Sequence, residues 1–151
     1  MYSIEIFPKR FLKPRVVIEN STITIYLSES QKESQAKELL EKFLIEFARK
    51  YITNKANKFS KDFDFKFNKI AIKEQKSRWG SCSSLNNLNF NWRLIFAIPE
   101  VIDYVIIHEL AHTKQMNHSS AFWSVVEQCM PHYSTYRNWL KQNGRYLFTA
   151  F

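Results

Sequence analysis

Three of the chain's four histidines lie in one stretch of eleven residues, HELAHTKQMNH, which runs from His108 to His118. His108 and His112 are four residues apart, so on an α-helix their side chains project from one face, about one turn from each other. Two neutral imidazoles placed in this way can bind the same metal ion. The fold must therefore contain a helix that turns these two histidines towards a shared space.

Glu109 completes the pattern H-E-x-x-H within this stretch. On the helix it lies to one side of the two histidines, close enough to reach a water molecule on a bound ion but turned away from the ligand pair. In H-E-x-x-H sites the imidazoles hold Zn²⁺ and the carboxylate takes a proton from the metal-bound water. The pattern therefore predicts a zinc site at His108 and His112, with Glu109 as the catalytic general base.

A catalytic zinc site needs a third protein ligand and an open position for water. His118 is the favoured candidate, because H-E-x-x-H followed by five residues and a histidine is the metzincin spacing. That pattern has glycine where this chain has Gln115, so we expect a different turn between Thr113 and Asn117, with Asn117 in the left-handed region. Three other residues have suitable donor atoms and are alternative candidates for the third ligand: Cys82, Glu127 and His132.

The apolar pattern around the motif predicts one domain over residues 1–151, without repeats or linkers. Strands are predicted where short runs alternate or are rich in β-branched residues, at 2–7, 15–19, 22–27 and 69–74. A long amphipathic helix is predicted from about Ser30 to Lys55. Its apolar stripe is Ala36, Leu40, Phe43, Phe47 and Tyr51.

Three further helices are predicted over residues 99–116, 120–130 and 133–143. Pro99 suits the first position of its helix, where a missing N–H does no harm. Ser119 or Ser120 can cap the next helix, and Gly144 is expected to end the last one. The motif thus lies on a helix whose other residues are those of a protein core.

The net charge of +8 is concentrated in residues 49–78, which hold ten basic residues against three acidic ones. Such a stretch is either a solvated lysine-rich surface or a footprint for an anionic partner such as nucleic acid. The residues expected to contact a nucleic acid are Tyr51, Lys55, Lys58, Phe59 and Lys61.

Neither a signal peptide nor a membrane-spanning segment is predicted from the sequence. The two cysteines, Cys82 and Cys129, are too few for a disulfide framework. The expected location is therefore the cytoplasm, with no membrane partner.

Several segments of the C-terminal half resemble the YgjP-like metal-dependent hydrolases, small zincin-type metallopeptidases related to the SprT and Wss families. The segments are SRWGSCSSLNNLNFNWRL, PEVIDYVIIHELAH, MNHSSAFW and MPHYSTYRNWL, and the resemblance is strong over about residues 76–144. It implies an α+β, zincin-like fold: a small twisted, mostly antiparallel sheet packed on helices that include the active-site helix. It also implies a catalytic role for Glu109 and metal ligation by His108, His112 and His118.

The clearest alternation in the chain runs from Leu88 to Phe96, with a large apolar residue at every second position. Asparagine and arginine occupy most positions between them, which predicts an exposed face or one lining a wet cleft. Zincins bind an extended peptide along an edge strand by main-chain pairing. We therefore expect the strand Asn87–Arg93 to be the sheet edge beside the metal, antiparallel to the bound substrate.

The sequence thus predicts a zinc-dependent hydrolase, most simply a metallopeptidase acting on a peptide or protein. A cation or phenol should stabilise the oxyanion, and the candidates after the third ligand are Tyr133, Tyr136 and Arg137. The alternative is a nucleic-acid-binding protein with a structural metal. A structural site is closed by four protein ligands, and Cys82 or His132 would then be the fourth.

Overall fold

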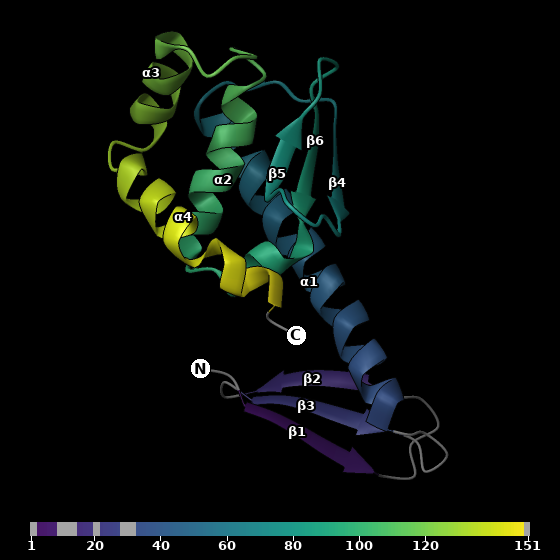
Figure 1. The fold of residues 1–151 in the computed structure, drawn as a ribbon. Helices are drawn as coiled ribbons and strands as arrows, with labels where there is room; N and C mark the ends of the chain where they lie inside the picture. Colours follow the sequence, from purple (N-terminus) through teal and green to yellow (C-terminus); the bar gives the residue numbers. More distant parts are fainter. Residues whose placement is uncertain (1–2, 9–14, 20–21, 28–32, 150–151) are drawn as a thin grey trace. The chain divides into compact units, whose positions relative to one another are not determined.

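The computed structural model describes residues 3–8, 15–19, 22–27 and 33–149. Contacts divide the chain into two compact units, residues 1–47 and 48–151. The division falls within one long helix, α1 (Glu33–Asp62), which is drawn in blue in Figure 1. The first part of the helix predicted from Ser30 lies outside the described residues, and so does Tyr2 of the first predicted strand.

The N-terminal unit contains a three-stranded sheet of β1 (Ser3–Pro8), β2 (Arg15–Glu19) and β3 (Thr22–Leu27). The central strand β3 pairs parallel with β1 and antiparallel with β2. Every second residue of β3 is buried. These strands lie where the period-two pattern predicted them.

Helix α1 is longer than predicted and buries a different stripe. It ends at Asp62 rather than Lys55, and Phe47 of the predicted stripe is 45% exposed. The buried residues follow steps of four: Ala36, Leu40, Leu44, Ala48, Ile52 and Ala56. This row of smaller residues continues beyond the aromatic stripe, which explains why the helix does not stop near Lys55.

The C-terminal unit contains a second three-stranded sheet, built from β4 (Lys69–Lys73), β5 (Gly80–Cys82) and β6 (Asn87–Asn91). The strand order is β4-β6-β5, so β6 is the central strand, parallel to β4 and antiparallel to β5. The prediction that Asn87–Arg93 forms the sheet edge is therefore wrong. The short strand β5, predicted as a loop, forms one edge instead.

The alternating segment 88–96 is not one strand, because Asn91 ends it. Strand β6 stops there and a 3-10 helix, η1 (Trp92–Phe96), follows. The Asn91 side chain accepts a hydrogen bond from the backbone N–H of Arg93 at 3.1 Å and donates one to the carbonyl of Gln75 at 2.7 Å. Asn91 is 0% exposed, so the predicted polar face is partly a buried hydrogen-bonding network.

Three helices complete this unit: α2 (Pro99–Ala111), α3 (Ser120–Cys129) and α4 (Tyr133–Thr149). Helix α2 lies between β5 on one side and α3 and α4 on the other (Figure 1). Most of its residues are buried, as expected for a helix with contacts on several sides.

Helix α4 continues through Gly144, which was predicted to end it. Gly144 is buried in the helix, and a Cβ there would lie 3.2 Å from the indole Nε1 of Trp79. Trp79 also stacks on Phe148, one turn further along, at a centroid distance of 3.9 Å. The glycine therefore serves close packing against Trp79 and not the end of the helix.

The fold class predicted from the sequence, α+β with small sheets packed on helices, is confirmed. Strand direction differs in detail, since each sheet combines one parallel and one antiparallel pair. No described helix is both long enough and apolar enough to span a membrane.

Candidate metal centre

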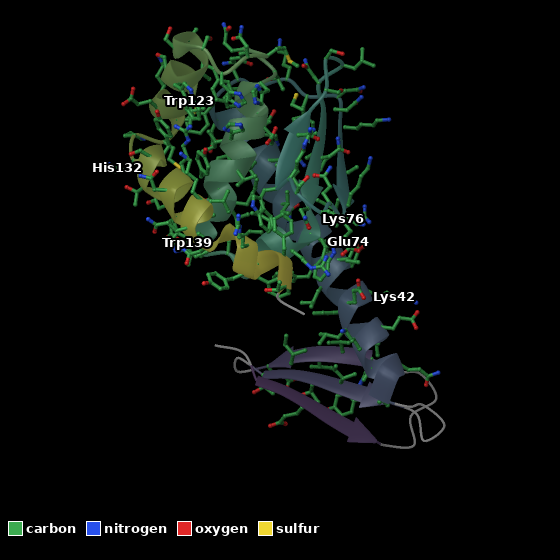
Figure 2. All side chains as sticks on the ribbon, in the orientation of Figure 1. Lys42, Glu74, Lys76, Trp123, His132 and Trp139 are labelled. Carbon is green, nitrogen blue, oxygen red and sulfur yellow. The ribbon has the colours of Figure 1, made fainter. Side chains whose placement is uncertain are left out.

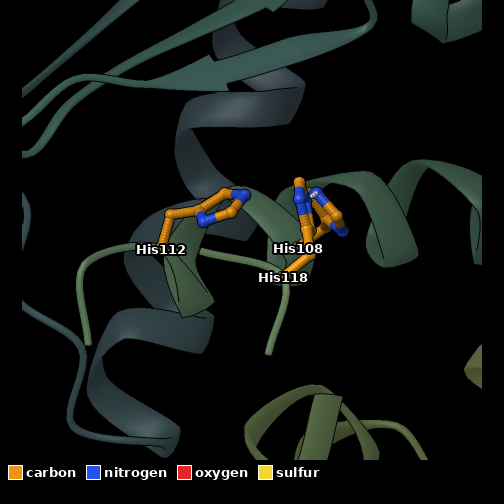
Figure 3. Close-up of side chains that lie close together, drawn as sticks. All are labelled: His108, His112 and His118. Carbon is orange, nitrogen blue, oxygen red and sulfur yellow. Dashed lines mark hydrogen bonds between the residues drawn. The ribbon is translucent and has the colours of Figure 1, made fainter. Parts of the chain in front are cut away.

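The three histidines of the motif come together at the C-terminal end of α2 (Figure 3). His108 lies in the last turn of α2, His112 is its C-cap residue, and His118 lies in the loop before α3. Their ring nitrogens that could act as ligands all lie within 4.8 Å of one another. The fold has therefore brought together the three residues that sequence spacing selected.

The turn that returns His118 begins earlier than predicted and uses no left-handed residue. The amides of Lys114 and Gln115 both donate to the Ala111 carbonyl, at 3.0 and 2.9 Å, and so end α2 well before Met116. Asp64 and Asn86 are the non-glycine residues with positive φ in the described parts of the chain. The expectation of a left-handed Asn117 is therefore wrong.

A hydrogen bond to a backbone carbonyl orients the imidazole of His112. His112 Nδ1 lies 3.1 Å from the carbonyl oxygen of Gln115, so this nitrogen carries the proton it donates and Nε2 keeps a free lone pair. His118 Nε2 lies 3.1 Å from His108 Nε2. Metal-binding histidines commonly donate one ring N–H to a backbone carbonyl, which leaves the other ring nitrogen available to the metal.

Aromatic side chains lie around the cluster, and burial keeps His108 and His112 neutral. Phe122 is 0% exposed, and its ring centroid lies 4.4 Å from that of His112 and 4.9 Å from those of His108 and His118. Burial, reinforced by the neighbouring histidines and Arg137, lowers the pKa of His108 to about 3. Burial also lowers the pKa of His112. Both rings are therefore uncharged at neutral pH, as metal ligands must be.

The donor set fits a metal ion. Nε2 of His108 and Nε2 of His118 face each other at 3.1 Å, and the backbone contact of His112 Nδ1 leaves Nε2 of His112 free for the same ion. The alternative third ligands Cys82, Glu127 and His132 are not part of the cluster. His132 lies exposed at the connection between α3 and α4 (Figure 2).

Glu109 packs against strand β5, on the flank of α2 beside the histidines. A Cβ on Gly80 would lie 2.6 Å from Cγ and 2.7 Å from Oε1 of Glu109, so only a glycine leaves room for this side chain. Glu109 is 6% exposed, and burial raises the pKa of its carboxyl to about 8 against the opposing charge of Arg78. Burial likewise raises the pKa of the Cys82 thiol to about 11, with a smaller contribution from Glu109.

Tyr104 lies beside the histidine cluster, although it was not among the residues predicted from the sequence. It lies one turn before His108 on α2, with ring centroids 5.9 Å apart. It is buried, and burial raises the pKa of its phenol to about 12. The spacing of four residues from His108 is the signal that could have found it, since it places the ring on the same helix face.

Beside this site is a cavity of about 240 Å³. Its walls come from α2, α4 and the chain entering β5, and both His108 and Glu109 reach it. The other lining residues are Arg78, Trp79, Gly80, Tyr104, Val105 and Leu140. The cavity is thus mainly apolar, with one cation at Arg78.

Two of the three residues predicted to stabilise an oxyanion lie near the histidines. Tyr133 is stacked between Tyr104 and Trp123, at centroid distances of 6.5 and 5.3 Å. The guanidinium of Arg137 lies 4.4 Å above the Trp123 ring, and its charge contributes to the lowered pKa of His108. Tyr136 occupies a half-buried position on the same helix.

A comparison with protein families finds a match over most of the chain. The family model described as YgjP-like, metallopeptidase domain, matches residues 1–143. Among curated proteins, none matches the chain.

The fold is similar to two crystal structures of metallopeptidase zymogens. Abylysin of Pyrococcus abyssi is 20% identical with a TM-score of 0.54, over 60% of this chain and 93% of that chain. Jannalysin of Methanocaldococcus jannaschii is 22% identical with a TM-score of 0.54, over 61% of this chain and 95% of that chain. At these identities the similarity establishes the fold alone.

Proposed function

The chain belongs to the YgjP-like metallopeptidase family, and on this premise we propose that it is a zinc-dependent protease with ligands His108, His112 and His118. Family membership gives the class of activity, a metal-dependent protease. The observation that carries the residue assignment is the convergence of three imidazoles within 4.8 Å at the end of a buried helix.

Zinc is the metal that this donor set favours. Imidazole nitrogens bind zinc at about 2.0–2.1 Å, and in a tetrahedral site two of them lie about 3.3 Å apart. The 3.1 Å between Nε2 of His108 and Nε2 of His118 is close to that separation. When bound, zinc would polarise the scissile carbonyl and lower the pKa of the attacking water.

Glu109 is proposed as the general base. Its carboxylate accepts a proton from the attacking water and then delivers it to the leaving amine. Its position supports this role, because it projects beside the histidine cluster without joining it. Burial between α2 and β5 raises the pKa of this carboxyl to about 8, and a bound cation nearby would favour the ionised form that accepts the proton.

Arg137 is the preferred candidate for stabilising the developing oxyanion. Its charge reaches both His108 and Tyr104, and Trp123 supports its guanidinium from below. Tyr133 and Tyr136 remain candidates, but the ring of Tyr133 is held between two aromatic neighbours.

We propose that the substrate runs along strand β5. This strand is an edge of its sheet, so one side of its backbone is available for pairing with an extended peptide. Glu109 lies against Gly80 at its start, which places the peptide beside the general base. The cavity of about 240 Å³ next to Glu109 would accept a large apolar side chain of the residue that supplies the leaving amine.

The alternative of a structural metal site is not favoured. Such a site is closed by four protein ligands, whereas the cluster found among the described residues contains three. Both cysteines are free, which fits a reducing compartment, and we propose the cytoplasm as the location.

Removal and restoration of the metal test this function. The protein should cleave an unfolded protein such as casein, and the activity should disappear with a zinc chelator and return with added Zn²⁺. Recovery with zinc is the critical step, because chelator inhibition alone does not identify the metal. Hydrolysis that persists in metal-free protein would disprove the proposed function.

A further inference from the structure

A second cavity, of about 380 Å³, lies away from the histidines, between α1 and β4. Four of its lining residues come from successive turns of α1 and two come from the chain at β4. They are Arg49, Lys50, Thr53, Asn54, Phe67 and Ile70. We call this cavity the α1–β4 groove. Its lining combines two cations, a hydroxyl, an amide and one aromatic ring.

All six of these residues lie within 49–78, the stretch that holds ten basic and three acidic residues. Two of the three acids are engaged in ion pairs, Asp62 with Lys58 and Glu74 with Arg93. Neither pair lines the groove. The positive charge of the stretch and the larger of the two cavities therefore coincide, although charge and cavity are independent observations.

We propose that the α1–β4 groove binds single-stranded nucleic acid. Arg49 and Lys50 would contact phosphates, and Thr53 and Asn54 would offer hydrogen bonds to sugar or base. The half-buried ring of Phe67 provides a surface on which a base stacks. Cationic grooves with aromatic stacking platforms are the usual means of binding single strands without sequence preference.

A strand fits better than a free nucleotide or a duplex. Besides Arg49 and Lys50 in the groove, exposed Lys66 and Lys69 adjoin Phe67 and Ile70 in the chain, which gives more cations than one nucleotide requires. In a duplex the bases are paired and stacked, so they cannot reach a ring at the floor of a groove. A single strand can place its phosphates on the cations and stack an unpaired base on Phe67 at the same time.

The structure also changes which residues of this stretch make the contact. Lys55 forms a partly buried ion pair with Asp103 at 2.9 Å, and it lies 5.8 Å from the ring centroids of both Tyr51 and Phe59. These residues do not line the groove. The predicted stacking rings Tyr51 and Phe59 are therefore replaced by Phe67 in the proposal.

Fluorescence anisotropy with labelled 12-nucleotide single strands of oligo-dT and oligo-rU tests the proposal. Wild-type protein should bind both at physiological salt, and a duplex of equal length more weakly. The double variant Arg49→Glu/Lys50→Glu should lose at least tenfold in affinity. Each phosphate neutralised on a single strand contributes about −0.7 to the slope of log K against log salt, so the loss of two contacts should flatten the slope by about 1.4.

Two matched variants complete the experiment. Lys141→Glu/Arg145→Glu makes the same charge change on exposed residues of α4 and should bind like wild type. Phe67→Leu keeps an apolar side chain but removes the ring, and should weaken binding about tenfold. Zinc content and proteolysis should be unchanged in the groove variants, which separates this proposal from the proposed function.

Any of the following results would overturn the proposal. One is the absence of single-strand binding at physiological salt. Another is equal loss of affinity in the α4 control, which would indicate a diffuse charge effect. The third is equal binding of the duplex, or competition by a mononucleotide at the same concentration as the oligonucleotide.

Discussion

Gly80 and Glu109 are in direct contact: a Cβ added to Gly80 would lie 2.7 Å from the carboxylate oxygen Oε1 of Glu109. Gly80 opens the edge strand β5, and Glu109 is the proposed general base on α2. The absence of a side chain at residue 80 thus sets how close the carboxylate comes to the strand along which the substrate is proposed to bind.

Gly80→Ala should lower hydrolysis about 10²-fold, because the methyl group displaces the Glu109 carboxylate from its working position. Gly80 does not have positive φ, so alanine is compatible with its backbone. Zinc content, measured by atomic emission, should stay at the wild-type level. Ser81→Ala, one residue along the same strand, is the control and should be nearly as active as wild type. Equal activity of both variants would show that Gly80 does not control the position of the Glu109 carboxylate.

Glu109→Gln should keep the fold and the zinc but lower hydrolysis by at least about 10²-fold, because an amide cannot accept the proton of the attacking water. Circular dichroism, metal analysis and casein cleavage together check this. Glu127→Gln, on the exposed face of α3, is the matched control. Loss of zinc from Glu109→Gln would mean that Glu109 is a ligand.

His118→Ala should weaken zinc binding strongly, and His108→Ala or His112→Ala should abolish it. The loss follows because two imidazoles remain where the site needs three. His132→Ala removes an exposed histidine outside the cluster and should leave zinc binding unchanged. Competition with a chromogenic chelator measures each affinity. Wild-type affinity in His118→Ala would move the third ligand elsewhere.

Asn91→Ala should destabilise the fold by about 2–3 kcal/mol, because it leaves the partly buried carbonyl of Gln75 without its donor and removes the cap of η1. Asn89→Ala is the control, since the Asn89 side chain donates one long hydrogen bond, 3.4 Å, to Ser81 Oγ. The control should change stability by less than about 0.5 kcal/mol. Urea denaturation of the two variants compares them directly, and equal midpoints would contradict the role given to Asn91.

Local spacing was sufficient to predict that the three histidines come together. The four-residue step from His108 to His112 fixes their relation on any helix, and the loop before α3 did return His118 to them. Tyr104 was not predicted although it has the same spacing, because a tyrosine on an apolar helix is usually interpreted as a residue of the hydrophobic core. Gly80 was missed because its significance is a tertiary contact across two elements.

Strand order was beyond the reach of the sequence. The alternation at residues 88–96 is the same whether a strand is central or at an edge, and only the pairing of β6 with both β4 and β5 decides. Its end at Asn91 depends on carbonyls of residues 75 and 78, far away in the chain. The prediction that Gly144 ends α4 failed for a similar reason, because the residue against which it packs, Trp79, lies elsewhere in the chain.

X-ray absorption at the zinc edge of the purified protein tests directly whether three histidines bind the metal. A site formed by His108, His112 and His118 should show three imidazole nitrogens and one oxygen at about 2.0–2.1 Å. A sulfur scatterer at about 2.3 Å would instead mean that a cysteine, Cys82 or Cys129, is a ligand. Four protein nitrogens would mean a closed, structural site, and either result would contradict a three-histidine catalytic centre.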